Sequence, residues 1–218
     1  MSFKFKNLNL VFIHIPKCGG SSIFTTLKKE KGIDFKLFKT HIKLSECDRY
    51  KFQNFNFITQ IRNPYSRFYS HYHYSIEWIY KRLKSELPPK GKSINFYNDL
   101  VRYLVKIKFN GFAELLVDFN KRKEFLNNFD NAESDSFIRI VDFLDQNRKV
   151  EIFKLEDGLL WNYLESNYNI KPSIKLFAKK STYKTMQYNQ KLANIVYEYF
   201  KEDFIKYSYD KDSWKKFQ

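Results

Sequence analysis

The sequence predicts an α/β fold in which a central, mainly parallel sheet is flanked by helices. Strand-length apolar runs alternate along the chain with segments of helical periodicity, and strands joined by helices generally pair in parallel. The first apolar run ends in a glycine turn that opens a helix. Hydrophobic residues make up 43% of the 218 residues, which suffices for a packed core. We therefore expect a single domain, residues 1–218, with a helical insertion at about 84–150.

Four segments are predicted to be strands. Residues 8–15 form an apolar run typical of a buried strand, and residues 55–61 form another. Residues 35–39 show the alternation of a short strand, and residues 150–155 supply the fourth. In this order each strand is followed by a loop or helix, so the carboxyl ends of parallel neighbours would meet at one edge of the sheet.

Helical periodicity fills most of the remaining chain. Asn63 and Pro64 are typical of an N-cap and a first-turn proline, so a helix is expected from there to about Leu83. Residues 169–185 are irregular and basic. The other helices are predicted at about 21–31, in several pieces within 94–147, at about 157–167 and at about 187–206.

The net charge of +15, from 39 basic and 24 acidic residues, favours an anionic partner. A solvated lysine-rich surface is the alternative explanation. The two cysteines, Cys18 and Cys47, form no disulfide framework or zinc pattern, and free thiols suit a reducing compartment. The chain starts without a signal-peptide pattern and has no run approaching the roughly 18 apolar residues of a membrane span. We expect a soluble, cytoplasmic protein that needs no metal.

The first candidate site is the turn after residues 8–15. Two glycines allow the backbone to approach an anion, and the following helix directs its free N–H groups and positive dipole end at the same point. Lys17 adds a flexible cation, and Ser21 and Ser22 add hydroxyl donors. The full segment is Ile15-Pro16-Lys17-Cys18-Gly19-Gly20-Ser21-Ser22.

Other phosphate loops do not fit this segment. A Walker A loop requires a lysine after its last glycine, and the dinucleotide fingerprint requires a third glycine. A phosphatase loop requires an arginine where Phe24 stands, so Cys18 lacks that partner although a helix N-terminus favours a lowered thiol pKa. A plain glycine turn between a strand and a helix is the structural alternative.

The second candidate site follows residues 55–61. Arg62 leaves the strand at its carboxyl end, and Ser70 lies two turns into the next helix, so a guanidinium and a hydroxyl can grip one phosphate. Either residue alone is better explained as an ordinary surface or helix residue. His41 directly follows residues 35–39, so Lys17, His41 and Arg62 stand at the ends of three successive strands.

Both motifs resemble those of sulfotransferases that use 3′-phosphoadenosine-5′-phosphosulfate (PAPS). The segment from His14 to Ser22 resembles the 5′-phosphosulfate loop, most closely that of the carbohydrate group with the heparan sulfate 2-O- and 6-O-sulfotransferases and related bacterial and viral enzymes. The family's 3′-phosphate motif is Arg-x-Pro-x-x-Arg-x-x-Ser-x-Tyr, and Arg62, Pro64, Arg67, Ser70 and Tyr72 stand in its register. The resemblance covers the first third of the chain well and the remainder loosely.

The resemblance implies a P-loop-like three-layer fold. It also implies that a sulfuryl group is transferred from PAPS to a hydroxyl, and carbohydrates are the expected acceptors. By this resemblance, Arg62 and Ser70 bind the 3′-phosphate and His41 acts as the general base. Lys17 stabilises the departing 5′-phosphate of the product, 3′-phosphoadenosine-5′-phosphate (PAP). Arg67 would support the helix or the phosphate edge. The donor's 5′ end would be held by Lys17, Cys18, Gly19, Gly20, Ser21 and Ser22.

Further candidates are less specific. Glu156, after residues 150–155, could orient His41, act as an alternative base or pair with a surface lysine, and the last is favoured. Lys180 and Ser181 are candidates for the donor's 3′-phosphate. The basic segments 79–93 and 171–184 are candidates for guiding an anionic acceptor, such as an acidic polysaccharide.

Two other functions remain open. A P-loop kinase has a related fold and loop, but the Walker lysine and an obvious Mg²⁺ aspartate are missing. A basic module that binds nucleic acid would suit the charge and the aromatic content, but the aromatics fall at core-like spacing and no RNA-binding signature is present. We therefore expect no nucleic-acid partner.

Overall fold

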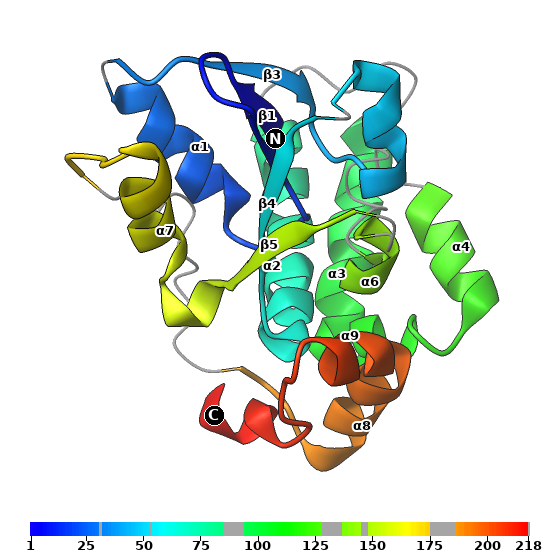
Figure 1. Ribbon diagram of the computed structural model, residues 1–218. Helices are drawn as coiled ribbons and strands as arrows, with labels where there is room; N and C mark the ends of the chain where they lie inside the picture. Colours follow the sequence, from blue (N-terminus) through cyan, green and yellow to red (C-terminus); the bar gives the residue numbers. More distant parts are fainter. Residues whose placement is uncertain are drawn as a thin grey trace.

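The computed structural model describes residues 1–30, 32–52, 54–84, 94–127, 137–144, 148–174 and 186–217. Its centre is an open five-stranded sheet with the strand order β3-β1-β2-β4-β5 (Figure 1). The strands are β1 (Ser2–Phe5), β2 (Leu10–Ile13), β3 (Phe35–Lys39), β4 (Asn56–Ile61) and β5 (Val150–Lys154). All four predicted strands are present, and the α/β class is confirmed.

The sheet is mixed and not mainly parallel as predicted, because β1 runs against both of its neighbours. β2 pairs with β4 in parallel, and β4 pairs with β5 in parallel, whereas β1 is antiparallel to both β2 and β3. β3 therefore points the same way as β2, and the four predicted strands end at one edge of the sheet. The prediction omitted β1, whose four residues alternate and bury Phe3 and Phe5.

Helices cover both faces of the sheet. On one face α1 (Gly20–Lys29) and α7 (Leu160–Tyr168) pack their apolar side chains, including Leu27 and Leu164, against the strands. On the other face lie the 3₁₀ helix η1 (Leu44–Tyr50), α6 (Ile140–Phe143) and the residue Tyr207. The sheet is thus the middle of three layers.

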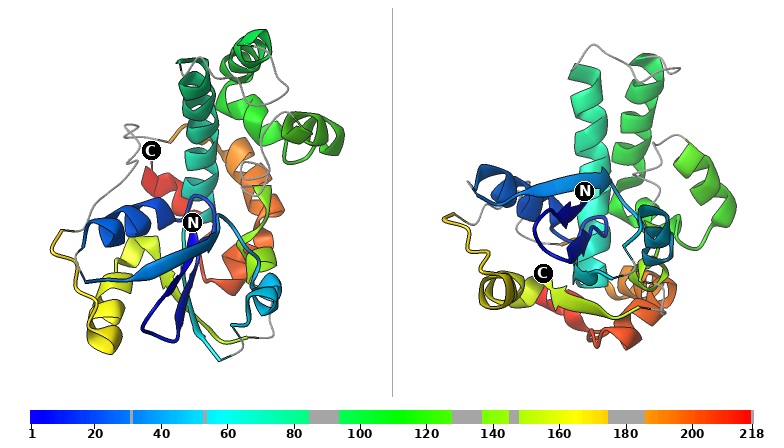
Figure 2. Two further views of the ribbon diagram at one scale, coloured as in Figure 1. Left: turned by 90° about the horizontal axis from the view of Figure 1, so that it is seen from above. Right: turned by 45° about the horizontal axis from the view of Figure 1, so that its top comes forward.

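A helical layer continues from the carboxyl edge of the sheet. The long helix α2 (Pro64–Lys84) leaves β4, and α3 (Ile94–Glu114) and α8 (Gln190–Tyr199) pack against it. Figure 2 shows α3 beside α2, with α4 (Phe119–Asn127) on its outer side. Phe68 of α2 stacks on Phe112 at a centroid distance of 5.2 Å, within a cluster rich in aromatic side chains. The range predicted as a helical insertion therefore supplies α3, α4 and α6.

Helix boundaries follow local chemistry. The Asn63 side chain accepts a hydrogen bond of 3.0 Å from the Tyr65 N–H, as expected of an N-cap before Pro64. The final predicted helix is divided at Phe200 into α8 and α9 (Lys201–Lys206). The buried carboxylate of Asp203 accepts the N–H groups of Ile140 and Val141 at 2.8 Å, so α9 turns to meet α6. Two short 3₁₀ helices, η3 (Leu155–Asp157) and η4 (Ser213–Phe217), complete the described elements.

Among the helices in these ranges, none has both the length and the apolar character needed to cross a membrane.

Candidate functional site

The loop between β2 and α1 requires both of its glycines. Gly19 has φ +83°, and a Cβ there would lie 3.1 Å from Leu155 Cδ1. A Cβ at Gly20 would stand only 2.0 Å from Cδ2 of His14. His14 is buried, as predicted, and its ring lies directly against the backbone at the start of α1. The sharp turn therefore has steric reasons beyond the need for an anion to approach.

The loop presents three unused N–H groups. Within the described part of the chain, the amides of Gly19, Gly20 and Ser21 meet no hydrogen-bond acceptor, while the Gly19 carbonyl already accepts the Ser22 N–H at 2.9 Å. They lie where α1 starts, at the positive end of its dipole. Successive free amides at such a place form a cradle suited to phosphate or sulfate.

Cys18 contributes no donor to this cradle, because its N–H donates to the Ile15 carbonyl at 3.3 Å. Its side chain is 1% exposed and packs into the core, and burial raises the pKa of the thiol to about 12. The lowered thiol pKa that its place near a helix N-terminus favours is therefore not found. The apolar surroundings outweigh the dipole and the charges of Arg67 and Arg62, and the thiol stays protonated.

Two arginines hold the loop by its carbonyl groups. Arg67 is 1% exposed, and its Nε donates to the Pro16 carbonyl over 3.0 Å. Arg62 donates from Nη1 to the Lys17 carbonyl over 3.4 Å and from Nε to Ser66 Oγ over 2.7 Å. Arg67 thus lies beneath the loop, where it supports the backbone, whereas Arg62 reaches the loop from the end of β4.

The side chain of Lys17 extends from this loop to α2. Its backbone is in the left-handed region, with φ +65°. Its Nζ stands over the ring of Tyr74, 3.5 Å from the centroid. Tyr74 is one turn beyond the half-buried Ser70 on α2, so Ser70, Tyr74 and the ammonium of Lys17 lie on one side of that helix.

Glu156 fastens the start of α2. Its Oε1 accepts the Asn63 N–H at 2.8 Å, and its Oε2 accepts the Tyr209 hydroxyl at 3.2 Å. Asn63 also donates from its side chain to Ser213 Oγ at 2.8 Å. The hydrogen bonds of this carboxylate go to the backbone beside Arg62 and to Tyr209, and among the residues that the structure describes it has neither a contact with His41 nor the expected lysine partner.

His41 reaches the loop through His14. Their ring centroids are 4.9 Å apart, and His14 in turn touches Gly20. Burial lowers the pKa of His14 well below its ordinary value, aided by the N-terminal amine and by His41. His14 therefore stays neutral beside the half-buried His41, which stands at the edge where β2, β3 and β4 end.

The two histidines of α2 are packed against other aromatic side chains. His71 is 1% exposed, and the centroid of its ring lies 4.7 Å from that of Phe137. Burial, with the charges of Lys17 and Arg67, lowers its pKa well below the ordinary value. His73 packs 4.4 Å from the Tyr69 ring, and burial lowers its pKa to about 4.

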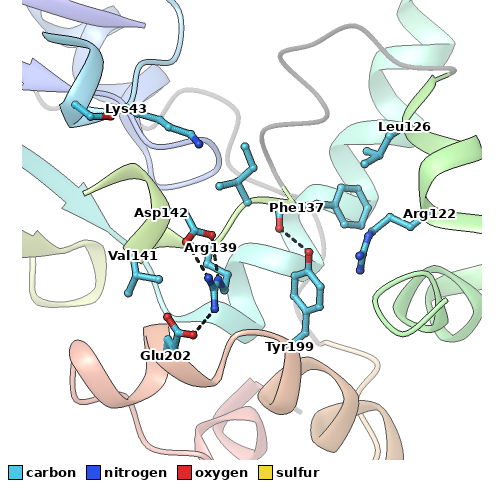
Figure 3. A pocket seen from close by; sticks show the side chains of 11 residues that line it. Lys43, Arg122, Leu126, Phe137, Arg139, Val141, Asp142, Tyr199 and Glu202 are labelled. Atoms are coloured by element: carbon cyan, nitrogen blue, oxygen red, sulfur yellow. Dashed lines mark hydrogen bonds and ion pairs between the residues drawn. The ribbon is translucent and has the colours of Figure 1, made fainter. Parts of the chain in front are cut away.

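A polar cavity of about 820 Å³ is lined by residues of η1, α4, α6, α8 and α9 and of the segments beside them. Figure 3 shows Lys43, two residues after His41, and Arg122 of α4 on opposite sides of it. Arg139 forms ion pairs with Asp142 and Glu202, so its charge is balanced. In the described ranges neither the ammonium of Lys43 nor the guanidinium of Arg122 has a carboxylate partner, although Arg122 donates to the Leu116 carbonyl at 2.6 Å.

The cavity and the loop are separate, and His71 connects them indirectly. Phe137, which lines the cavity, contacts His71, and His71 is electrostatically coupled to Lys17. Residues of the phosphate-loop segment itself do not line the cavity. The cavity was not predicted from the sequence, because its lining residues come from four distant segments with no shared motif.

Several predicted candidates fall outside the described residues. They are Lys180 and Ser181, most of the basic segment 171–184, and the turn around Lys90 and Lys92. No group of three or more potential metal ligands occurs in the ranges that the structure covers.

No family model, curated protein or solved structure matches the chain.

Proposed function

We propose that the protein transfers a sulfuryl group from PAPS to a hydroxyl of a carbohydrate. The observation that carries the proposal is the meeting of three strand ends. The amide cradle with Lys17 follows β2, His41 follows β3, and Arg62 follows β4, all at one edge of the sheet. Ligands of open α/β sheets bind at this edge.

The donor's two ends match two separate groups. The amides of Gly19, Gly20 and Ser21 suit the 5′-phosphosulfate. Arg62 and Ser70 suit the 3′-phosphate, since Arg62 retains an Nη2 group beyond the two donors that it already uses. Burial lowers the pKa of Arg62, but an arginine remains charged at neutral pH.

The chemistry would be an in-line displacement at sulfur. The acceptor oxygen forms the new S–O bond, and the bond between sulfur and the bridging oxygen of the 5′-phosphate breaks, releasing PAP. His41 takes the hydroxyl proton, for which a near-neutral imidazole is suited. Lys17 and the cradle amides stabilise the negative charge that grows on the departing phosphate.

The acceptor is proposed to enter from the polar cavity. Its volume accommodates a small oligosaccharide, and Lys43 places one of its walls two residues from His41. The cations Lys43 and Arg122 favour an acceptor that carries negative charge.

The first test is ligand-dependent stability. PAP should raise the melting temperature, because a ligand bound by the native state stabilises it by mass action. ATP, which lacks the 3′-phosphate, should bind less well. Equal binding of the two would contradict the role of Arg62 and Ser70, and tighter binding of ATP would favour a kinase. Salt-sensitive binding of oligonucleotides without any effect of PAP would favour a nucleic-acid module.

The second test is the reaction. Labelled sulfate should pass from PAPS to at least one member of a panel of neutral and acidic glycans. The label should remain on the donor when Lys17→Ala replaces the wild-type protein.

A further inference from the structure

The ammonium of Lys17 rests on an aromatic ring that the phosphate-loop pattern does not include. Nζ lies 3.5 Å from the centroid of Tyr74, close enough for a strong cation–π contact. Both side chains are only partly exposed, so water screens this attraction less than it would at an open surface. The ring belongs to α2, whereas the lysine belongs to the loop between β2 and α1.

The backbone of the loop is held independently of this contact. Arg67 binds the Pro16 carbonyl, and Arg62 binds the Lys17 carbonyl. The positive φ of Lys17 is uncommon for a residue with a side chain, and these two hydrogen bonds help to maintain it. The peptide therefore has a defined position, but the four-carbon side chain beyond it retains several rotatable bonds.

The contact with Tyr74 links the loop to the helix that carries Ser70. Tyr74 stands one turn after Ser70 on α2, and Lys17 precedes Gly19 and Gly20 by two and three residues in the loop. On the proposed function, the two residues in contact are therefore neighbours in sequence of the two groups that would bind the donor's phosphates. Fixing a flexible charge in advance removes an entropy cost from the step that uses it.

We infer that Tyr74 is a positioning residue, which holds the Lys17 ammonium beside the amide cradle so that its charge is in place when the donor reacts. The inference rests on the proposed function for its catalytic part. Its structural part, the contact of Lys17 with Tyr74, is measurable without any turnover. The aromatic ring is required and the hydroxyl is not, since phenylalanine offers a comparable π-face.

The contact is tested by the reactivity of Lys17 toward limiting acetic anhydride, with mass spectrometry as the readout. Lys149, whose side chain is 90% exposed, serves as the internal reference. Acetylation of Lys17 relative to Lys149 should rise about 3- to 30-fold in Tyr74→Leu and stay near the wild-type value in Tyr74→Phe. Tyr80→Leu is the matched control, because Tyr80 lies on α2 but is 47% exposed.

The catalytic part is tested by kinetics with PAPS. Tyr74→Leu should lower kcat about 3- to 30-fold, while the Kd of PAP changes less than about threefold, because the cradle and Arg62 are untouched. Tyr74→Phe should restore kcat. A purely structural role would instead lower the melting temperature and affect both variants. If Tyr74→Leu fails to fold, Tyr74→Met, which also lacks a ring, replaces it.

The outcomes separate the two proposals. Wild-type reactivity of Lys17 and wild-type kcat in a folded Tyr74→Leu or Tyr74→Met protein would overturn the inference. Altered Lys17 reactivity in a protein that neither binds PAP nor transfers sulfate would leave the contact standing and refute sulfuryl transfer.

Discussion

Arg67 donates from Nε to the carbonyl oxygen of Pro16 across 3.0 Å, and this hydrogen bond ties the middle of the loop between β2 and α1 to α2. The guanidinium is almost completely buried, so water cannot replace it as the partner of that carbonyl. The loop that is proposed to bind the donor's 5′ end is thereby supported from the helix that carries the proposed 3′-phosphate site.

Replacing Arg67 by methionine should therefore destabilise the fold. The Pro16 carbonyl would lose its donor in a buried place, which costs about 1–3 kcal/mol in the free energy of unfolding. Urea denaturation measures the loss, with Arg102→Met as a control because the Arg102 side chain is 81% exposed. The affinity of the Arg67→Met variant for PAP should fall together with its stability. An Arg67→Met variant as stable as the wild type would show that the buried hydrogen bond contributes little to the free energy of unfolding.

Gly20→Ala should reveal the steric contact with His14. The added methyl would lie 2.0 Å from the ring, and forcing such contacts apart typically costs about 1–3 kcal/mol. Removing the ring by His14→Ala should relieve much of this cost, so the two changes should be non-additive in a double-mutant cycle of unfolding free energies. Additive changes would mean that the loop accommodates the methyl without moving His14.

Stability should decrease on acidification from about pH 6.5 downward, where histidine in the unfolded chain takes up protons. The folded-state pKa of His71 is lowered, so the native state binds fewer protons than the unfolded state in this window. The free energy of unfolding therefore rises with pH through this window, and the contribution of His71 is complete above it. That contribution amounts to about 1.4 kcal/mol for each unit by which the folded and unfolded pKa values differ. His71→Phe should reduce the difference in unfolding free energy between pH 5 and pH 7. An unchanged pH dependence would assign the effect to His14 and His73.

The reaction proposed for Lys17 and His41 should respond to each side chain separately. His41→Ala should lower turnover roughly a hundredfold or more, and added imidazole should restore part of it, because a general base can be replaced by a diffusible one. Lys17→Ala should lose most of its turnover without that rescue. Lys191→Ala, at a side chain that is 77% exposed, is the control. Near-normal turnover of His41→Ala would place the base elsewhere.

The cavity makes a prediction about the acceptor. Lys43→Ala and Arg122→Ala should each raise the Michaelis constant of an acidic acceptor while leaving PAP affinity nearly unchanged, because neither residue belongs to the phosphate loop. The apparent affinity of that acceptor should also weaken as salt is added. If neutral and acidic glycans react equally well in both variants at low salt, the cavity does not select the acceptor by charge.

The sequence predicted those parts of the fold that are set by local patterns. Residues 8–15, 35–39, 55–61 and 150–155 were recognisable as strands, and their shared edge followed from the alternation with helices. β1 escaped prediction because the alternation of its four residues is too short to identify a strand, and its direction depends on pairing with β2 and β3. The break between α8 and α9 depends on contacts of Asp203 with a segment about sixty residues away, which no local window contains.

The same division applies to the candidate site. Glycines, Lys17 and Arg62 stand out because their types and spacing suit phosphate directly. Arg67, Tyr74 and Glu156 acquire their contacts only when β2, α2 and the chain after β5 come together. An aromatic residue such as Tyr74 is especially inconspicuous, because many of its neighbours on α2 are also aromatic and most of them fill the core.

The antiparallel β1 also determines the order in which the site can be assembled. Its partners β2 and β3 lie within the first forty residues, so this half of the sheet forms from contacts that are short in sequence and carries both the phosphate loop and His41. β5 joins β4 only after the chain has passed through α2, α3, α4 and α6. Closing that long loop is the entropically costly step. The hydrogen bond from the N–H of Asn63, the neighbour of Arg62, to Glu156 must wait for it. The proposed 3′-phosphate site is therefore completed late in folding, after the loop that is proposed to bind the 5′ end.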